Sequence, residues 1–373
     1  MIGQEEKQAV LRVMERGVLS GYQGNWSDAF YGGPEVREME REWAEYFGVK
    51  HAITCNSATS GLWLACAAIG LQWHRIPEEK GSAVQYIPDE VICTPYSMTC
   101  SATIPLHFGA KPVFADIERD YYCLDPKDVE AKITPNTKAI IVVDIFGQPY
   151  DADAINAIAK KHGLYVIEDA AQAIGAKYKG KYAGTLGDIG VFSLNVHKHI
   201  QCGEGGVVVT NDSDLAFRLR LVMNHAEAVM NGMPENCGIL IDGGETTWVH
   251  NYYDLVGMNL RMTELQAAIA REQLKKLNGI LEIVRENAKY FPVKVRPECE
   301  HAHYRYAIID QEFKTDFEAG AWMNNERFNS KPHYITPLYK MPLFRSLGYA
   351  QDLCPVCEEV EENIVLAWLK EVV

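Results

Sequence analysis

Apolar residues in the first two-thirds of the chain fall into short β-branched runs that alternate with stretches of helical spacing. The runs predict strands at His51–Cys55, Glu90–Cys93, Lys111–Ala115, Ala139–Asp144, Tyr165–Glu168, Gly190–Ser193 and Val207–Thr210. The intervening pattern predicts helices at Gly61–Ile69, Asp151–His162 and Leu215–Met223. Because alternating strands and helices build parallel sheets with both faces covered, we expect an α/β fold with a mostly parallel central sheet. Ligands of such sheets bind at the carboxyl ends of the strands.

The pattern changes in the last third of the chain. Met230–Asn251 is rich in Gly, Asn and Thr without clear periodicity, which indicates a long loop at the end of a large domain. Thr263–Lys276 follows with a strong helical pattern and Thr263 as its cap. We therefore expect a large domain over residues 1–240, whose N-terminal helix packs towards a smaller α+β domain over residues 241–373.

Composition excludes some classes of partner. The 373 residues are 47% hydrophobic, enough for two domains, and their net charge of −14 argues against nucleic acids and anionic membranes as partners. The sequence has no apolar run of about 18 residues, so no membrane-spanning helix is expected. The N-terminal segment is charged and lacks the apolar core of a signal peptide, which predicts a cytoplasmic protein.

The ten cysteines are scattered, and several lie in apolar runs: Cys55, Cys66, Cys93 and Cys100. This distribution predicts buried free thiols in a reducing compartment. The Cys354-Pro-Val-Cys357 pair has no second pair beside it, and a structural zinc site needs four ligands. We expect no metal site.

Asp169 stands where the apolar run of Tyr165–Glu168 stops, at the expected carboxyl end of a strand. A carboxylate there faces the ligand crevice. Gln172 follows three residues later, on the same face of the next turn. An aspartate in this position can also be the N-cap of a helix, so Asp169 alone does not decide the chemistry.

Lys198 lies between two predicted buried strands and precedes the turn Gly203-Glu204-Gly205-Gly206. A desolvated lysine has a lowered pKa, and its amine can then form a Schiff base and shuttle protons. Ser193, at the end of the preceding strand, can donate to a phosphate. A lysine on a surface hairpin is the alternative interpretation.

The loop Asn56–Gly61 joins a predicted strand to a helix. Free N–H groups at a helix N-terminus and the hydroxyls of Ser57 and Thr59 can form a phosphate cup. Ordinary Ser/Thr capping is again the alternative. A strand-end acid, a lysine and a phosphate cup together fit pyridoxal phosphate (PLP), whose ring nitrogen pairs with a carboxylate so that the ring can accept electrons.

Seven stretches carry a resemblance over nearly the whole chain: TCNSATSGLWLA, DEVICTPYSMT, GAKPVFADIERD, TKAIIVVDIFGQPYDADAI, VIEDAAQAIGAKYKGKYAGTLGDIGVFS, KHIQCGEGGVVVTND and MNLRMTELQAAI. In this order they resemble the sugar aminotransferases of the DegT/DnrJ/StrS family. The resemblance implies the fold of the fold-type I PLP-dependent transferases and a PLP-dependent transaminase.

The resemblance also implies residue roles. Lys198 would be the Schiff-base lysine, Asp169 would pair with the pyridine nitrogen, and Gln172 would lie near the ring oxygen. The phosphate would be held by Ser57, Ala58, Thr59 and Ser193. Asn259 would reach the phosphate from the partner subunit, so a homodimer with shared active sites is implied.

Some positions depart from the family's pattern. Alignment on Pro95 places Met98 where the family often has an aromatic ring stacked on PLP; its thioether can still pack on a ring, and Tyr96 is the alternative. Ala58 replaces the glycine of the family's Ser-Gly-Thr cup. His197 and His199 flank Lys198, and a branch of the family that dehydrates sugars has histidine in place of the lysine. The spacing to the GEGG turn places lysine at the critical position, which favours transamination.

We therefore expect a ping-pong transfer of an amino group from an amino acid, first of all L-glutamate, to a keto sugar linked to a nucleotide, in polysaccharide biosynthesis. Four side chains are candidates for binding such a sugar: Arg218, Arg261, Lys331 and His333. The alternatives are a keto cyclitol or small phosphorylated ketone as acceptor, or sugar dehydration. A regulatory protein on the same fold is disfavoured by the intact Lys198–Asp169 pair. A dehydrogenase is disfavoured because the first strand lacks a following Gly-x-Gly-x-x-Gly.

Overall fold

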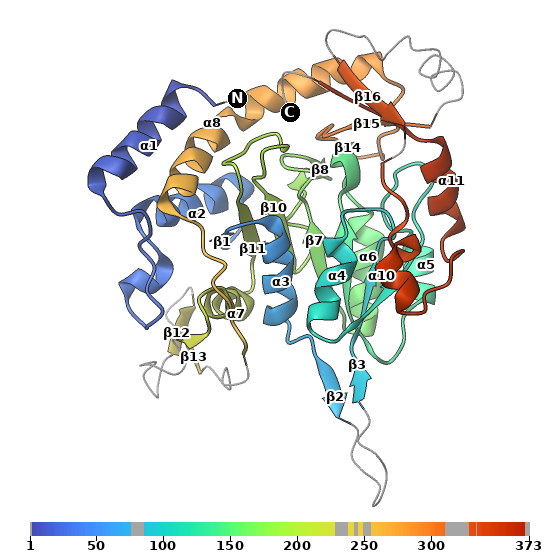
Figure 1. Cartoon of the computed structure of the whole chain (residues 1–373), viewed down its shortest axis with the longest axis horizontal. Coiled ribbons are helices and arrows are strands. Elements are labelled where there is room, and N and C mark those ends of the chain that lie inside the picture. The colour runs from blue at the N-terminus through green and yellow to red at the C-terminus, as the bar shows by residue number, and fades with distance from the viewer. Residues whose placement is uncertain are drawn as a thin grey trace, which may run out of the picture. The chain divides into compact units, whose positions relative to one another are not determined.

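The computed structural model describes residues 2–75, 86–227, 238–241, 245–248, 255–309, 328–332 and 334–369 (Figure 1). The chain forms two compact units. The first comprises Met1–Gly70, Val191–Val196 and Ile200–Lys276. The second comprises Leu71–Gly190, His197–His199 and Leu277–Val373. A domain division between residues 240 and 241 stays a proposal.

In the first unit, β1 (His51–Cys55) pairs antiparallel with β11 (Gly206–Thr210), with Cys55 opposite Gly206. Three helices pack on this pair or on one another: α2 (Pro34–Phe47), α3 (Ala58–Ala68) and α7 (Ser213–Met223). Ser57 begins α3, since its side chain accepts a hydrogen bond from the N–H of Ser60 at 3.1 Å. The β1–β11 pair therefore fixes the start of α3.

Helix α1 (Gln4–Arg16) packs on α8 (Glu264–Asn287) through Ala9, Val13 and Ala268. At one end of this contact, the carboxylate of Glu6 accepts a hydrogen bond from Lys276 Nζ at 2.6 Å. Helix α1, near the start of the first unit, therefore packs on the part of α8 with which that unit ends. The predicted helix at Thr263–Lys276 is confirmed, but α8 runs further, because Leu277, Leu281 and Val284 continue its buried apolar face.

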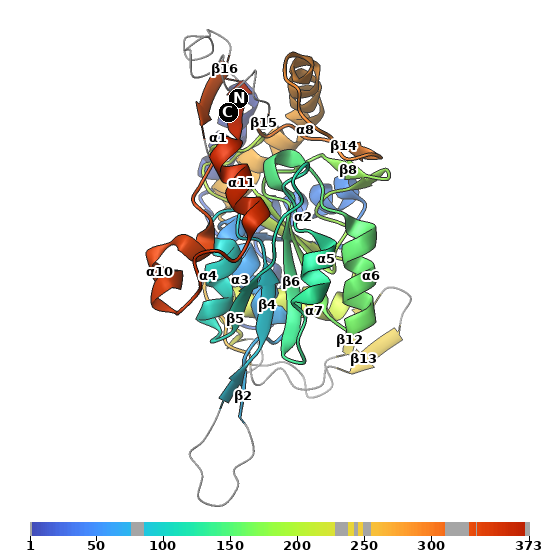
Figure 2. The same ribbon diagram turned by 90° about the vertical axis from the view of Figure 1, so that its right-hand side faces the viewer.

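The second unit contains four parallel strands in the order β7-β6-β4-β5. Their bounds are β4 (Glu90–Cys93), β5 (Lys111–Phe114), β6 (Thr137–Val143) and β7 (Tyr165–Asp169). Figure 2 shows α4 (Cys100–His107) on one side of these strands, with α5 (Pro126–Ala131) and α6 (Ala152–His162) on the other. The inner strands β4, β6 and β7 are almost entirely buried, as their apolar runs predicted, whereas the edge strand β5 is partly exposed.

With β10 (Ile189–Ser193), these strands belong to a seven-stranded sheet of order β1-β11-β10-β7-β6-β4-β5. The prediction of an α/β fold with a mostly parallel central sheet is confirmed. The predicted strand at Ala139–Asp144 is shifted, because β6 starts at Thr137 and ends before Asp144. The Asp144 side chain instead accepts a hydrogen bond from the backbone N–H of Tyr150 at 2.9 Å.

The prediction of a loop over Met230–Asn251 is wrong for two of its segments. There β12 (Gly238–Ile241) pairs antiparallel with β13 (Glu245–Trp248). The sequence carries two hairpin signals that the loop interpretation overlooked, the Gly243-Gly244 dipeptide and the β-branched pair Thr246-Thr247. The rest of that stretch lies outside the described residues.

The second unit also contains two small sheets. One, of order β14-β8-β9, consists of Cys299–Glu300, Lys177–Tyr178 and Lys181–Tyr182. The other, of order β15-β17-β16, consists of Tyr306–Ile308, Val365–Leu369 and Phe328–Pro332. Helices α10 (Pro342–Ser346) and α11 (Pro355–Asn363) precede β17. In the described ranges, no helix combines the length and apolar character needed to cross a membrane.

The remaining elements are short. They are η1 (Asp28–Tyr31), β2 (Trp73–Arg75), β3 (Tyr86–Pro88), η2 (Ile145–Gly147), η4 (Ala288–Tyr290) and η5 (Leu338–Lys340). Strands β2 and β3 pair antiparallel with each other.

The contact between β11 and the start of α3 predicts the effect of a single methyl group. A Cβ at Gly206 would lie 2.6 Å from the carbonyl carbon of Ser57 and 2.8 Å from the nitrogen of Ala58. We expect Gly206→Ala to destabilise the protein by about 2 kcal/mol, because backbone atoms must move apart. Gly279→Ala, on the exposed side of α8 with no atom near the added Cβ, should instead stabilise it by about 1 kcal/mol. Thermal denaturation measures both, and equal stability of the two variants would contradict the packing.

Candidate active site

Asp169 lies at the carboxyl end of β7, opposite Val143 of β6, and is 5% exposed. Its Oδ1 accepts a hydrogen bond from the N–H of Ala171 at 3.0 Å. Burial raises the pKa of Asp169, while this N–H and the positive charge of Lys198 act to lower it. The strand end thus presents a buried carboxyl group with a cation as its electrostatic partner.

Lys198 belongs to the same unit as Asp169 and is half-buried. Its Nζ lies 4.6 Å from the ring centroid of Tyr304, a cation–π distance. The positive charge of Lys198 therefore acts on the Asp169 carboxyl group, although 28 other residues separate the two in the sequence. Tyr304 was not foreseen from the sequence, because it comes from a distant segment with no motif around it.

Gln172 is buried beside them. Its Oε1 accepts a hydrogen bond from the N–H of Phe146 at 2.9 Å, and its Nε2 donates to the hydroxyl of Tyr334 at 3.1 Å. Phe146 has a φ of 58°, in the left-handed region, which aims its N–H at the amide. Tyr334 and Phe146 are site residues that sequence reasoning missed.

Three aromatic rings form a wall beside Gln172. Tyr96 contacts Tyr334 at a centroid distance of 5.6 Å and Phe146 at 6.3 Å, both edge to face. Phe146 contacts Tyr334 at 5.1 Å. Tyr96 is completely buried in this wall, whereas Met98 is 56% exposed. The ring of Tyr96 therefore packs inside the wall, whereas the side chain of Met98 is accessible.

Two further buried carboxyl groups lie behind Asp169. The backbone N–H of Asp144 donates to the carbonyl of Asp169 at 3.0 Å. Glu168 accepts hydrogen bonds from the N–H groups of Gly184, Leu186 and Gly187. Burial raises the pKa of Asp144 far above its ordinary value, and the charge of Glu168 raises it further. The backbone of Asp144 and the carboxylate of Glu168 thus tie the end of β7 to its neighbouring segments.

His199, next to Lys198, is buried, and its Nε2–H donates to the carbonyl of Ala302 at 2.8 Å. Burial lowers its pKa to about 4. His301 and His303 are also buried, with ring centroids 4.3 Å apart, and burial lowers the pKa of His303 to about 4. This cluster connects the lysine loop to the segment that carries Tyr304. In the described part of the chain, no group of three His, Cys, Asp or Glu residues is arranged to hold a metal ion.

The first unit holds the predicted phosphate cup. Ser57 Oγ caps α3, Ala58 is its first residue, and Thr59 is exposed. Gly206 lies so close to Ser57 and Ala58 that no side chain fits between β11 and the cup. The cup has the backbone N–H groups and hydroxyls that bind a phosphate.

Ser193 and Asn259 also belong to the first unit. Ser193, at the end of β10, is buried, and its Oγ accepts the N–H of Asn195 at 3.3 Å. Asn259 is exposed, and its Oδ1 accepts Arg261 Nε at 2.9 Å. The next residue, Leu260, accepts the N–H of Asn56 through its carbonyl at 2.8 Å, so this segment adjoins the cup.

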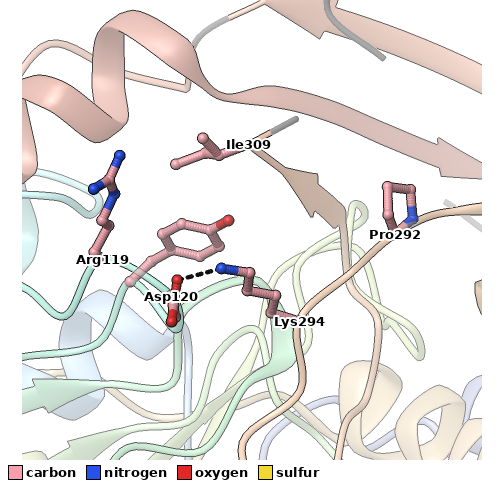
Figure 3. A pocket seen from close by; sticks show the side chains of 6 residues that line it. Arg119, Asp120, Pro292, Lys294 and Ile309 are labelled. Carbon is pink, nitrogen blue, oxygen red and sulfur yellow. Dashed lines mark hydrogen bonds and ion pairs between the residues drawn. The ribbon is translucent and has the colours of Figure 1, made fainter. Parts of the chain in front are cut away.

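A separate pocket of about 340 Å³ in the second unit contains none of the candidate residues (Figure 3). It is lined by Arg119, Asp120, Tyr122, Pro292, Lys294 and Ile309. Lys294 pairs with Asp120 at 2.5 Å, and Arg119 pairs with Glu359. Because each cation already has an acidic partner, the pocket is not suited to binding an anion.

Comparison with known proteins identifies the chain's relatives. The family model of the DegT/DnrJ/EryC1/StrS aminotransferases matches residues 17–369. The chain belongs to this family. The expected membership is thereby confirmed, and with it a PLP-dependent aminotransferase.

Three relatives illustrate the similarity. The spore coat polysaccharide biosynthesis protein SpsC of Bacillus subtilis is 37% identical over 75% of this chain, and the match spans 64% of that protein. A UDP-N-acetyl-3-dehydro-alpha-D-glucosamine 3-aminotransferase of Acidithiobacillus ferrooxidans is 33% identical over 93% of this chain and 87% of its own. The X-ray structure of an aminotransferase from Psychrobacter cryohalolentis matches with a TM-score of 0.78 and 27% identity, over 98% of this chain and 91% of that one.

The residues present fit the family's cofactor. A buried acid beside a lysine suits a protonated pyridine nitrogen and a carbonyl carbon, and a helix N-terminus with hydroxyls suits a phosphate. Cys55 and Cys66 are buried, and burial raises the pKa of both to about 12. Their thiols therefore stay protonated and unreactive.

The histidine cluster predicts acid sensitivity. An unfolded histidine has a pKa near 6.5, whereas His199 has about 4 when folded, so the unfolded state binds more protons between these values. Stability should fall as pH drops from 6.5 to 4, by an amount on the order of 3 kcal/mol for His199 alone. Chemical denaturation across this range measures the fall. His199→Gln should remove the His199 share of this fall, and the exposed control His107→Gln should not. Identical slopes for all three proteins would refute the cause.

Proposed function

We propose that this aminotransferase moves an amino group from an amino acid, L-glutamate first of all, to the keto group of a nucleotide-linked sugar by a ping-pong mechanism. The single observation that carries the chemistry is the buried Asp169 with Lys198 as its cationic partner. The relative from Acidithiobacillus ferrooxidans, named for a UDP-linked keto sugar, supports the substrate class. SpsC supports a role in polysaccharide biosynthesis.

Lys198 would hold PLP through its amine. When bound, PLP supplies an electron sink for the bond-breaking at the amino acid's Cα. With a donor bound, the Lys198 amine would take up the proton lost from Cα as a general base and give it back as a general acid. The half-buried setting of the amine and the adjacent ring of Tyr304 keep bulk water away from this transfer.

Asp169 keeps the pyridine nitrogen protonated. Burial disfavours its charged form, so a cation beside it is needed to hold it as a carboxylate. Gln172, which is held by hydrogen bonds to Phe146 and Tyr334, would contact the ring oxygen through its amide. Met98, whose side chain is accessible, would contact the cofactor in the place of the family's aromatic residue.

The phosphate is held by Ser57, Ala58, Thr59 and Ser193, and by Asn259 of a second copy of the chain. We propose a homodimer with shared active sites for this reason, in the cytoplasm. The exposure of Asn259 supports this role, since its side chain is accessible to a partner.

Three cationic side chains in the described ranges are candidates for binding the sugar. Arg261 donates to Asn259 and Asn224, Lys331 lies 5.6 Å from the ring of Tyr334, and Arg218 lies on α7. Of these, Lys331 is the one beside the aromatic wall of the site. His333, the fourth candidate, lies outside the described residues.

The proposal is tested by incubating the protein with PLP, L-glutamate and a panel of keto compounds, and measuring 2-oxoglutarate. A nucleotide-linked keto sugar should give release. Lys198→Ala should lose both turnover and the yellow absorbance of the lysine-bound cofactor, while the exposed control Lys160→Ala keeps both.

Other outcomes would redirect the proposal. Release only with a cyclitol or small phosphorylated ketone would exclude nucleotide-linked sugars as substrates. Loss of water from the sugar without 2-oxoglutarate would show a dehydratase. Retained turnover in Lys198→Ala would remove the lysine from the mechanism.

A further inference from the structure

Arg305 is a largely buried arginine one residue after Tyr304. Its guanidinium carbon lies 4.1 Å from the ring centroid of Tyr304 and 4.9 Å from that of Trp368. Nη1 donates to the carbonyl of Tyr304 at 2.7 Å, and Nη2 donates to its hydroxyl at 3.3 Å. The planar group is thus held by the ring and two oxygens of Tyr304 and by the ring of Trp368.

In the described ranges, Arg305 makes no ion pair with a carboxylate. Other buried arginines do: Arg220 pairs with Glu40 at 2.9 Å, and Arg296 pairs with Glu118. Burial lowers the pKa of Arg305, so its charge is held at a cost in free energy. A guanidinium has five N–H donors, and the two bonds to Tyr304 leave three of them for an incoming group.

This cation lies at the candidate active site. The ring of Tyr304 is within cation–π distance of both Arg305 and Lys198 Nζ, so a single aromatic ring links the two. The backbone N–H of Arg305 donates to the carbonyl of Phe146 at 3.2 Å, and the N–H of Phe146 donates to Gln172. Arg305 is therefore fixed to the same framework as the residues assigned to the cofactor.

We propose that Arg305 binds a carboxylate of the amino-acid donor; this rests on the proposed function. A planar guanidinium with unused N–H groups binds carboxylates through paired hydrogen bonds. An amino acid carries its α-carboxylate on the carbon that Lys198 deprotonates, so an anion site close to the lysine matches the size of a donor. A nucleotide-linked sugar carries its charge many bonds from its keto carbon and does not match that distance.

The first test is equilibrium binding of glutarate, a dicarboxylate that cannot react, to the PLP-loaded protein by calorimetry. Arg305→Leu should weaken glutarate binding on the order of 10- to 100-fold, the cost of losing charge-assisted hydrogen bonds. Arg305→Lys should recover part of the loss. The exposed control Arg345→Leu should bind glutarate as the wild type does.

The second test follows the two half-reactions separately. In Arg305→Leu, the concentration of L-glutamate that gives a half-maximal rate should rise. The corresponding concentration of the keto acceptor should stay the same. If L-glutamine loses affinity as well, the α-carboxylate is the ligand. If only L-glutamate does, the side-chain carboxylate is the ligand.

Two outcomes would overturn the inference. One is that Arg305→Leu binds glutarate as tightly as the wild type does, although borohydride reduction still attaches the cofactor to Lys198 of this variant. The other is weakened use of the keto acceptor with donor use intact. Failure of borohydride to fix any cofactor on wild-type Lys198 would instead overturn the proposed function itself, so the two failures are distinguishable.

Discussion

The burial of the Asp169 carboxyl group at the end of β7 is the constraint on which the site depends. A charged carboxylate is costly in this position, and a cation must compensate for it. Lys198 supplies part of that compensation in the protein alone, and on the proposed function a protonated pyridine nitrogen would supply it more directly. The fold thus prepares an electrostatic environment that a cationic heteroaromatic ring completes.

The surroundings of Asp169 hold it in place. Asp144 and Glu168 secure the strand end through backbone hydrogen bonds, and Gln172 connects it to the wall of Tyr96, Phe146 and Tyr334. On the other side, His199 fastens the lysine loop to Ala302, two residues before Tyr304. Packed side chains, rather than the loop alone, therefore determine where the amine lies.

Local patterns predicted the elements well because each is specified by adjacent residues. The apolar run before Asp169 ends at a polar residue, and Lys198 stands at a fixed distance from a glycine-rich turn. The residues that were missed, Tyr304, Arg305 and Tyr334, come from distant segments and have no periodicity of their own. Their place depends on how those segments pack, which spacing along the chain does not encode. The β12–β13 hairpin was missed for a different reason, since glycine and asparagine obscured a short β-branched signal.

The most direct measurement is a crystal structure of the protein loaded with PLP. The account predicts that the Asp169 carboxylate lies within hydrogen-bond distance of the ring nitrogen and that Lys198 Nζ is bonded to the carbon at the opposite side of the same ring. A cofactor held away from Asp169, or attached to a different lysine, would contradict it.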